Sequence, residues 1–191
     1  MIAVRKKRGS MKPIVTCLLF VALATASRPA APEEPATAPA RRTIDLGGAW
    51  EFRRVGDAEW LQATVPGVVH LDLLAAGRID DPFFRDNERR LQWIGRADWE
   101  YRRFFDAGVR AGDRADLVFE GLDTVAEVFL NDSLVLSSDN MFRRHRIPCA
   151  GLLRERGNEL RVRFRSARQI AEKRWKALGV DLPGGCLLYT S

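Results

Sequence analysis

Residues 125–136 read VAEVFLNDSLVL, and this stretch decides the fold class. Two apolar runs, 125–130 and 133–136, are separated by Asn131 and Asp132, which are residue types that favour a tight turn. The first run is rich in Val, Leu and Phe, which suit a pleated, half-buried surface. We therefore predict a β-hairpin at this point of the chain.

The neighbouring stretches repeat the β pattern. Apolar or aromatic residues alternate with charged ones, the period of two that is typical of a half-buried strand, in Ala49–Arg53 (AWEFR), Trp99–Phe104 (WEYRRF) and Asn158–Phe164 (NELRVRF). Leu117–Gly121 is a short run that suits a buried strand. These stretches predict several short strands joined by turns.

Helical patterns are few and short. The sequence predicts helices only at Val69–Ala75 and Ala167–Lys176. Many short strands with few helices predict an all-β, antiparallel β-sandwich whose order begins near Arg42. Periodicity alone leaves an immunoglobulin-like topology and a jelly roll both open.

The N-terminus has the pattern of a secretory signal peptide. Basic residues lie between Arg5 and Lys12, an apolar run covers Ile14–Leu23, and Ala24-Thr25-Ala26 is a small-x-small cleavage pattern. The apolar run is about half the length of a membrane span. We predict a signal peptide at 1–26 and export to the periplasm or the medium, with no membrane attachment after cleavage. A start at Met11 and an uncleaved anchor remain as alternatives.

A linker and a tail flank the predicted domain. Residues 27–41 are rich in Pro and Ala and predict an extended linker. Residues 42–185 then form the β-sandwich domain. The last six residues, 186–191 (CLLYTS), have no cap or partner strand in their pattern, so we expect a non-native tail on a domain that is incomplete at its C-terminal end.

Charge argues against a nucleic-acid-binding protein. The formal net charge is +6, and residues 1–42 account for it, since residues 43–191 carry 23 basic and 23 acidic side chains. Within that part, 43–139 carry 11 basic and 19 acidic residues, and 140–191 carry 12 and 4. This asymmetry favours two faces that attract each other, or a contact with a part of the protein outside this chain. We expect Arg143, Arg144 and Arg146 to pair with acidic groups on a neighbouring strand or domain.

Metal and cofactor chemistry have no support in the sequence. The two His residues, His70 and His145, are far from each other and from Cys, and no phosphate-binding or redox motif is present. Beyond the predicted leader, Cys149 and Cys186 could form one disulfide at most. We predict no metal site and no cofactor.

Nine short segments then occur in the order typical of one enzyme family. They are Leu46–Trp50 (LGGAW), Val65–His70 (VPGVVH), Asp81–Glu88 (DPFFRDNE), Gln92–Ile94 (QWI), Asp98–Tyr101 (DWEY), Gly121–Thr124 (GLDT), the run that ends at Asn131, Asp139–Phe142 (DNMF) and Gly157–Leu160 (GNEL). With these segments the chain resembles the N-terminal sugar-binding domain of glycoside hydrolase family 2 enzymes. The DPFFRDNE segment favours the β-mannosidases among them.

The resemblance implies a galactose-binding-like jelly roll that precedes an immunoglobulin-like domain and a (β/α)8 barrel. Family members are exo-acting and retaining, and both catalytic Glu residues lie on the barrel. The chain is then a non-catalytic fragment, inactive alone, of an enzyme that removes terminal non-reducing β-D-mannose from β-mannoside oligosaccharides or glycoprotein glycans. The alternatives are a free-standing carbohydrate-binding β-sandwich and a fragment of another family 2 exo-glycosidase (β-galactosidase, β-glucuronidase or exo-glucosaminidase).

Candidate sugar contacts lie in the DPFFRDNE segment. We predict that Asp86, Asn87 and Glu88 offer carboxylates and an amide to sugar hydroxyls at the rim of the sandwich. The alternative is a loop held by its own hydrogen bonds. Asp80 and Asp81 are adjacent, so they point apart on an extended segment, and we expect solvated turn residues there.

Overall fold

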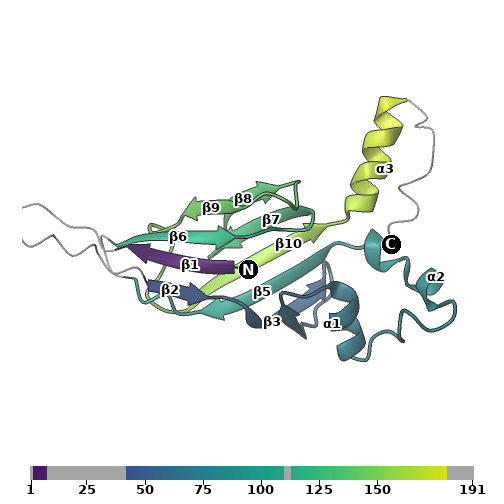
Figure 1. The fold of residues 1–191 in the computed structure, drawn as a ribbon, viewed down its shortest axis with the longest axis horizontal. Coiled ribbons are helices and arrows are strands. Elements are labelled where there is room, and N and C mark those ends of the chain that lie inside the picture. Colours follow the sequence, from purple (N-terminus) through teal and green to yellow (C-terminus); the bar gives the residue numbers. More distant parts are fainter. Residues whose placement is uncertain (1, 8–41, 110–112, 180–191) are drawn as a thin grey trace, which may run out of the picture.

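The computed structural model describes residues 2–7, 42–109 and 113–179 (Figure 1). The strands in chain order are β1 (Ile2–Lys7), β2 (Arg42–Asp45), β3 (Gly48–Arg54), β4 (Leu61–Val65), β5 (Trp99–Phe105), β6 (Arg114–Phe119), β7 (Val125–Leu130), β8 (Ser133–Ser138), β9 (His145–Pro148) and β10 (Asn158–Arg165). The helices are α1 (Val69–Ala75), α2 (Asn87–Leu91), the 3-10 turn η1 (Ile94–Arg96) and α3 (Ala167–Leu178).

Two antiparallel sheets form the described part of the chain, as the sequence predicts. One has the order β2-β1-β6-β9 and the other β4-β3-β5-β10-β7-β8. The predicted hairpin is present: Leu130 pairs with Ser133, and Asn131 and Asp132 have φ angles of 49° and 67°. Positive φ at both central residues is what a type I′ two-residue hairpin turn requires. The all-β sandwich is thereby confirmed.

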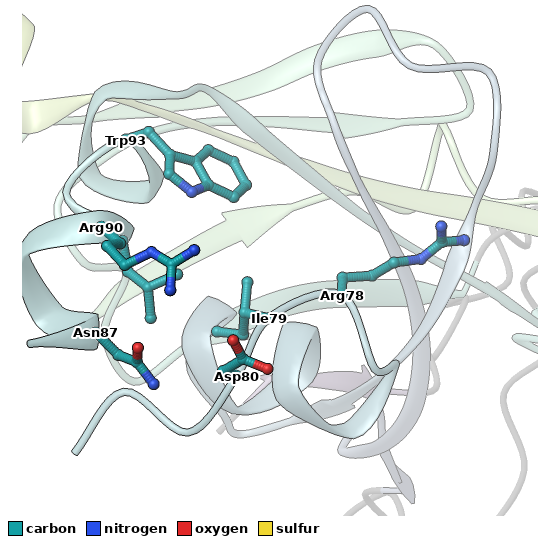
Figure 2. A pocket seen from close by; sticks show the side chains of 7 residues that line it. Arg78, Ile79, Asp80, Asn87, Arg90 and Trp93 are labelled. Carbon is teal, nitrogen blue, oxygen red and sulfur yellow. The ribbon is translucent and has the colours of Figure 1, made fainter. Parts of the chain in front are cut away.

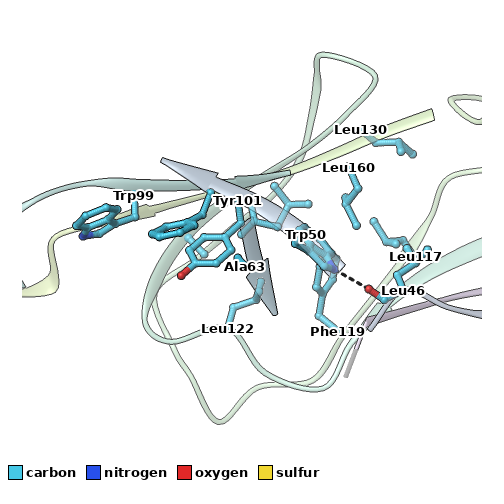
Figure 3. Packing of buried hydrophobic residues seen from close by; sticks show 14 of the residues in the cluster. Leu46, Trp50, Ala63, Trp99, Tyr101, Leu117, Phe119, Leu122, Leu130 and Leu160 are labelled. Carbon is cyan, nitrogen blue, oxygen red and sulfur yellow. Dashed lines mark hydrogen bonds between the residues drawn. The ribbon is translucent and has the colours of Figure 1, made fainter. Parts of the chain in front are cut away.

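The core lies between the two sheets. Alternate residues of β3, β7 and β10 face it, so Phe52, Val128 and Leu160 are fully buried. From the other sheet, Leu117 and Phe119 of β6 meet them (Figure 3). The indole N–H of Trp50 donates to the Leu46 carbonyl over 2.7 Å, which satisfies the one polar group of this large buried ring.

The outer face of the larger sheet carries cross-strand ion pairs. Glu51 accepts from Arg102 at 2.7 Å, and Glu100 accepts from Arg53 at 3.0 Å, each pair directly opposite in the β3–β5 register. The guanidinium groups of both Arg residues lie over the ring of Trp60, at 4.3 and 3.9 Å from its centroid. These contacts explain why the charged positions of the alternation are only partly exposed.

The smaller sheet also carries ion pairs that the charge asymmetry predicts. Arg144 pairs with Glu120 at 3.0 Å, and Arg146 pairs with Asp116 across β9 and β6. Basic residues of 140–191 therefore meet acidic residues of 43–139 within the domain. Cys149, at the end of β9, is a buried free thiol, and Cys186 lies outside the described residues.

One strand comes from an unexpected part of the chain. Ile2–Lys7, the start of the predicted signal peptide, forms β1 between β2 and β6, so order does not begin at Arg42 as we expected. A strand position there pairs backbone groups that β2 and β6 would otherwise leave open. Residues 8–26 of the leader, the linker at 27–41 and the tail at 186–191 lie outside the described residues. Cleavage after Ala26 stays a prediction.

Candidate functional site

The long connection between β4 and β5, residues 66–98, gathers at one end of the larger sheet with α1, α2 and η1 (Figure 1). Asp72 of α1 anchors it. One carboxylate oxygen accepts the Thr64 N–H over 3.1 Å, and the other accepts the Tyr101 hydroxyl over 2.8 Å. Since Asp72 is only 6% exposed, both bonds are shielded from water. One side chain thus fixes α1 to β4 and to β5.

The hydrogen bond to Asp72 also affects the pKa of Tyr101. Burial, and then the hydrogen bond to Asp72 and its negative charge, raise the pKa of the Tyr101 phenol well above its usual value. The ring stacks on Phe52 at 5.5 Å. Tyr101 is therefore protonated at neutral pH and donates its hydroxyl hydrogen to Asp72.

The segment after α1 is held by its own turn. The Asp81 side chain accepts the Phe83 N–H over 2.9 Å, and the Asp81 carbonyl accepts the side-chain amide of Asn87, also over 2.9 Å. Asn87 is 9% exposed and begins α2. Its N–H₂ group therefore serves the loop, which is the alternative we considered for this segment.

A pocket of about 220 Å³ opens between residues 78–80 and α2 (Figure 2). It is lined by Arg78, Ile79, Asp80, Asn87, Arg90, Leu91 and Trp93. The volume lies below the roughly 300–1,000 Å³ of sites that enclose a drug-sized ligand. The pocket alone can hold one part of a ligand, and the rest would need another wall.

The polar groups of the pocket differ in how far they are engaged. The guanidinium of Arg78 pairs with Glu59 at 2.6 Å, and both side chains are about half exposed or more. Among the described residues, no ion pair engages Asp80 or Arg90. A free carboxylate, a free guanidinium and an amide oxygen beside an indole face can bind the hydroxyls and the ring face of a polar, cyclic ligand.

Of the three predicted sugar contacts, the structure brings only Asn87 to the pocket. Asp86 and Glu88 are exposed and do not line it. Asp86 precedes α2 and makes no capping bond through its side chain. Sugar binding by these residues stays a prediction.

Among the pocket residues that sequence reasoning did not predict, Asp80 and Arg90 carry the charged groups without an ion pair in the described part of the chain. We interpreted Asp80 as a solvated turn residue, and it is exposed, yet it also lines the pocket. Arg90 follows Arg89 in a run of charges, and nothing in that run distinguishes the pocket residue from its neighbour. Arg90 faces the pocket because of its position on α2, a helix that the sequence did not predict.

Trp93 and Trp99 have different roles. Trp99 is buried and donates its indole N–H to the Ile94 carbonyl over 3.1 Å. Trp93 is 40% exposed and lines the pocket, with its ring 6.0 Å from that of Trp99. A half-exposed indole supported by a buried one is a rigid apolar wall.

The helix after β10 closes the same end of the domain. Ser166 caps α3 by accepting the Gln169 N–H, and its hydroxyl donates to the Gly95 carbonyl over 2.7 Å. Arg96 pairs with Glu172 at 3.0 Å. These contacts fix η1, and with it the chain that carries Trp93.

Within the described ranges, no three His, Cys, Asp or Glu side chains are placed to hold a metal ion. The described helices include none that is long and apolar enough to span a bilayer.

Comparisons with known proteins agree with this geometry. Residues 50–188 match the glycosyl hydrolase 2 galactose-binding domain-like family. Beta-mannosidase B of Thermothelomyces thermophilus is 46% identical over 66% of this chain, and the beta-mannosidase of Rattus norvegicus is 36% identical over 71% of it. The chain spans 15% of the length of each of these curated relatives.

A solved structure is similar as well. Beta-D-mannosidase from Dictyoglomus thermophilum superposes with a TM-score of 0.69 and is 40% identical, over 75% of this chain and 18% of that one. An exo-chitosanase from Amycolatopsis orientalis has a TM-score of 0.55 and 18% identity, over 62% of this chain and 16% of that one, and this likeness concerns the fold alone.

Proposed function

Since this chain belongs to the glycosyl hydrolase 2 galactose-binding domain-like family, we propose that it is the non-catalytic N-terminal part of an exported, exo-acting retaining β-mannosidase. The parent enzyme then hydrolyses terminal non-reducing β-D-mannosides. Its two catalytic carboxyl groups, about 5–5.5 Å apart in a retaining enzyme, belong to a domain outside this chain.

The observation that carries the proposal is the difference in identity between relatives. The proteins called beta-mannosidases are 36–46% identical to this chain in two sequences and 40% in a structure. The exo-chitosanase, which has the same fold, is 18% identical. A fold shared by many activities does not select a substrate, whereas this level of identity over two thirds of the chain favours one of them.

The pocket gives the domain a role in the parent enzyme. A domain outside this chain would supply the missing wall, and Asp80, Arg90 and Trp93 would then contact the sugar or its aglycone beside the catalytic site. Asn87 would contribute mainly by holding Asp81 and the loop. This role rests on the free state of Asp80 and Arg90 and on the small volume of the pocket.

Exposed aromatic side chains beside the pocket support a neighbouring domain. Phe83 is 93% exposed and Phe84 is 57% exposed, both on the segment that the Asp81 turn presents. Two adjacent exposed Phe residues on one loop are unfavourable in water unless another surface covers them. We propose that further domains of the parent protein pack on this loop.

The direct test is hydrolysis of p-nitrophenyl glycosides by the complete parent protein. We expect kcat/KM for the β-D-mannoside to exceed that for the β-galactoside, β-glucuronide and β-glucosaminide, and we expect the 191-residue chain to be inactive. A parent that prefers another glycoside would overturn the substrate. If the complete protein has no second domain and still binds mannan, the result would support a free-standing carbohydrate-binding domain instead.

A further inference from the structure

The smaller sheet depends on a strand that the proposed export would remove. Residues 2–7 pair with β2 from Ala3↔Asp45 to Lys6↔Arg42, and with β6 from Ile2↔Phe119 to Lys7↔Arg114. Both pairings are antiparallel. In the order β2-β1-β6-β9, β1 is the one strand of this sheet beside β2, so its removal separates β2 from the sheet.

The position cannot stay empty without cost. Leu117 and Phe119 of β6 are fully buried and belong to the main core. Without β1, the backbone of β6 would have an open edge next to these side chains. Open edges expose unpaired N–H and C=O groups and promote association with other chains.

We propose that the gap between β2 and β6 is a strand-acceptor site. Residues 2–7 occupy it while the leader is attached, and an extended segment of the parent protein outside residues 1–191 occupies it after cleavage. The inference rests on the proposed export. A segment is available because the relatives are several times longer than this chain, which spans 15% of their length.

The site sets the properties of its occupant. The segment is about as long as β1, which has six residues, and runs antiparallel to both neighbours. Its backbone supplies the hydrogen bonds, and alternate side chains are apolar where they lie beside the buried Leu117 and Phe119 of the neighbouring strand β6, on the face turned to the core. β1 itself carries Arg5, Lys6 and Lys7, so charged residues are accepted at some positions of the occupant, whereas a glycine-rich segment would lack the apolar side chains.

The first experiment tests the acceptor in the 191-residue chain. A protease site is placed in the linker at 27–40, the chain is folded and then cut, and an excess of labelled synthetic peptide of residues 1–8 is added. We expect the label to enter the protein. The matched peptide with Val4→Pro should enter at least about tenfold less, because Val4 lies opposite Ile44 and Leu117 and proline lacks the N–H. Equal uptake of both peptides, or none, overturns the acceptor.

The second experiment tests the occupant in the complete parent protein without residues 1–26. Amide hydrogen exchange of 42–45 and 114–119 should be as slow as in the uncut 191-residue chain. Fast exchange there overturns the proposal. Slow exchange only at high protein concentration, with a dimer, shows that a second copy supplies the strand and also overturns it.

A pair of introduced cysteines tests whether β2 and β6 pair directly with each other after β1 is removed. Thr43 and Asp116 both lie opposite Arg5, one on each side of β1, so two strand spacings, about 10 Å, separate them. A disulfide needs a Cα separation below about 7 Å. In the mature parent, Thr43→Cys with Asp116→Cys should stay reduced. A disulfide between these positions shows a closed gap and overturns the proposal.

Activity separates this inference from the proposed function. Hydrolysis of the aryl β-mannoside is measured on the same mature parent sample. If the mature parent is fully active but 42–45 and 114–119 exchange fast, or the cysteine pair forms a disulfide, the strand-acceptor proposal is wrong and the proposed function stands. If these amides exchange slowly but the mature parent does not hydrolyse the β-mannoside, the proposed substrate is wrong and the strand-acceptor proposal stands.

Discussion

The bond between Tyr101 and Asp72 is expected to hold the candidate site in place, and Tyr101→Phe tests it. The substitution keeps the ring, and with it the stacking on Phe52 at 5.5 Å and the edge contact with Phe164 at 5.9 Å. It removes the hydroxyl that donates to Asp72 over 2.8 Å. Within the described part of the chain, the Thr64 N–H then remains as the one hydrogen-bond donor to the side chain of Asp72, a residue that is 6% exposed.

The magnitude follows from that burial. A hydrogen bond to a charged group contributes about 1.5–3 kcal/mol, and the upper half applies when the remaining partner is left buried. We expect the free energy of unfolding to fall by about 2–3 kcal/mol and the melting temperature by roughly 5–10 °C. Urea unfolding of the 191-residue chain, followed by Trp fluorescence, measures the loss.

Asp72→Asn completes a double-mutant cycle. If the two side chains act through one bond, the double variant will lose less stability than the sum of the single variants, by about 1 kcal/mol or more. A loss below about 0.5 kcal/mol for Tyr101→Phe, or simple additivity in the cycle, would refute the reasoning. Hydrogen exchange of 69–75 should quicken in both single variants, since Asp72 ties α1 to the sheet.

Three further predictions concern other parts of the domain. Burial, with the charge of Asp116, raises the pKa of the Cys149 thiol from 9.0 to about 11. The folded state therefore keeps a proton that the unfolded state releases, and stability should fall by about 1.4 kcal/mol per pH unit between pH 9 and 11. Cys149→Ala should lack this part of the fall, and an unchanged slope in urea titrations would contradict it. In the parent enzyme, Arg90→Gln should lower kcat/KM for the β-mannoside about 5–100-fold, whereas Arg89→Gln, one residue away and outside the pocket, should not; equal effects would argue against the pocket. Asn158 is fully buried and makes four side-chain hydrogen bonds. Asn158→Ala should therefore lower the free energy of unfolding by about 2–4 kcal/mol. A loss below about 1 kcal/mol, measured by calorimetry, would contradict this prediction.

The strands that periodicity predicted are those that cross the core. β10 alternates over its whole length because one of its faces covers the core and the other carries the arginines. The edge strands gave no such signal: β4 (LQATV) and β9 (HRIP) are short, and little of either is buried. β4 pairs with β3, the strand directly before it, whereas β9 pairs with β6, so that β7 and β8 lie between the two partners in the chain. With so little burial, neither strand has an alternating pattern that would announce it.

The candidate site was predictable only as a segment. The segment from Asp80 to Glu88 indicated a functional loop, and Asn87 of that segment lines the pocket, whereas its contact with sugar stays a prediction. That Arg90 faces the pocket and Arg89 does not depends on α2, a helix of five residues without a side-chain cap. An isolated helix this short is unstable, so its sequence carries almost no helical signal.

The place of β10 in the sheet also sets the order in which the chain can fold. β10 lies between β5 and β7, and its last residue, Arg165, follows the end of β5 at Phe105 by 60 positions. At about 5–20 residues per second, a ribosome needs roughly 3–12 s to synthesise that interval. During this time Trp99, Tyr101 and Phe105 have no neighbour on one side, and β7 has none toward the sheet centre. The larger sheet of the nascent chain therefore stays open until β10 is made, and until then its apolar side chains depend on protection from aggregation.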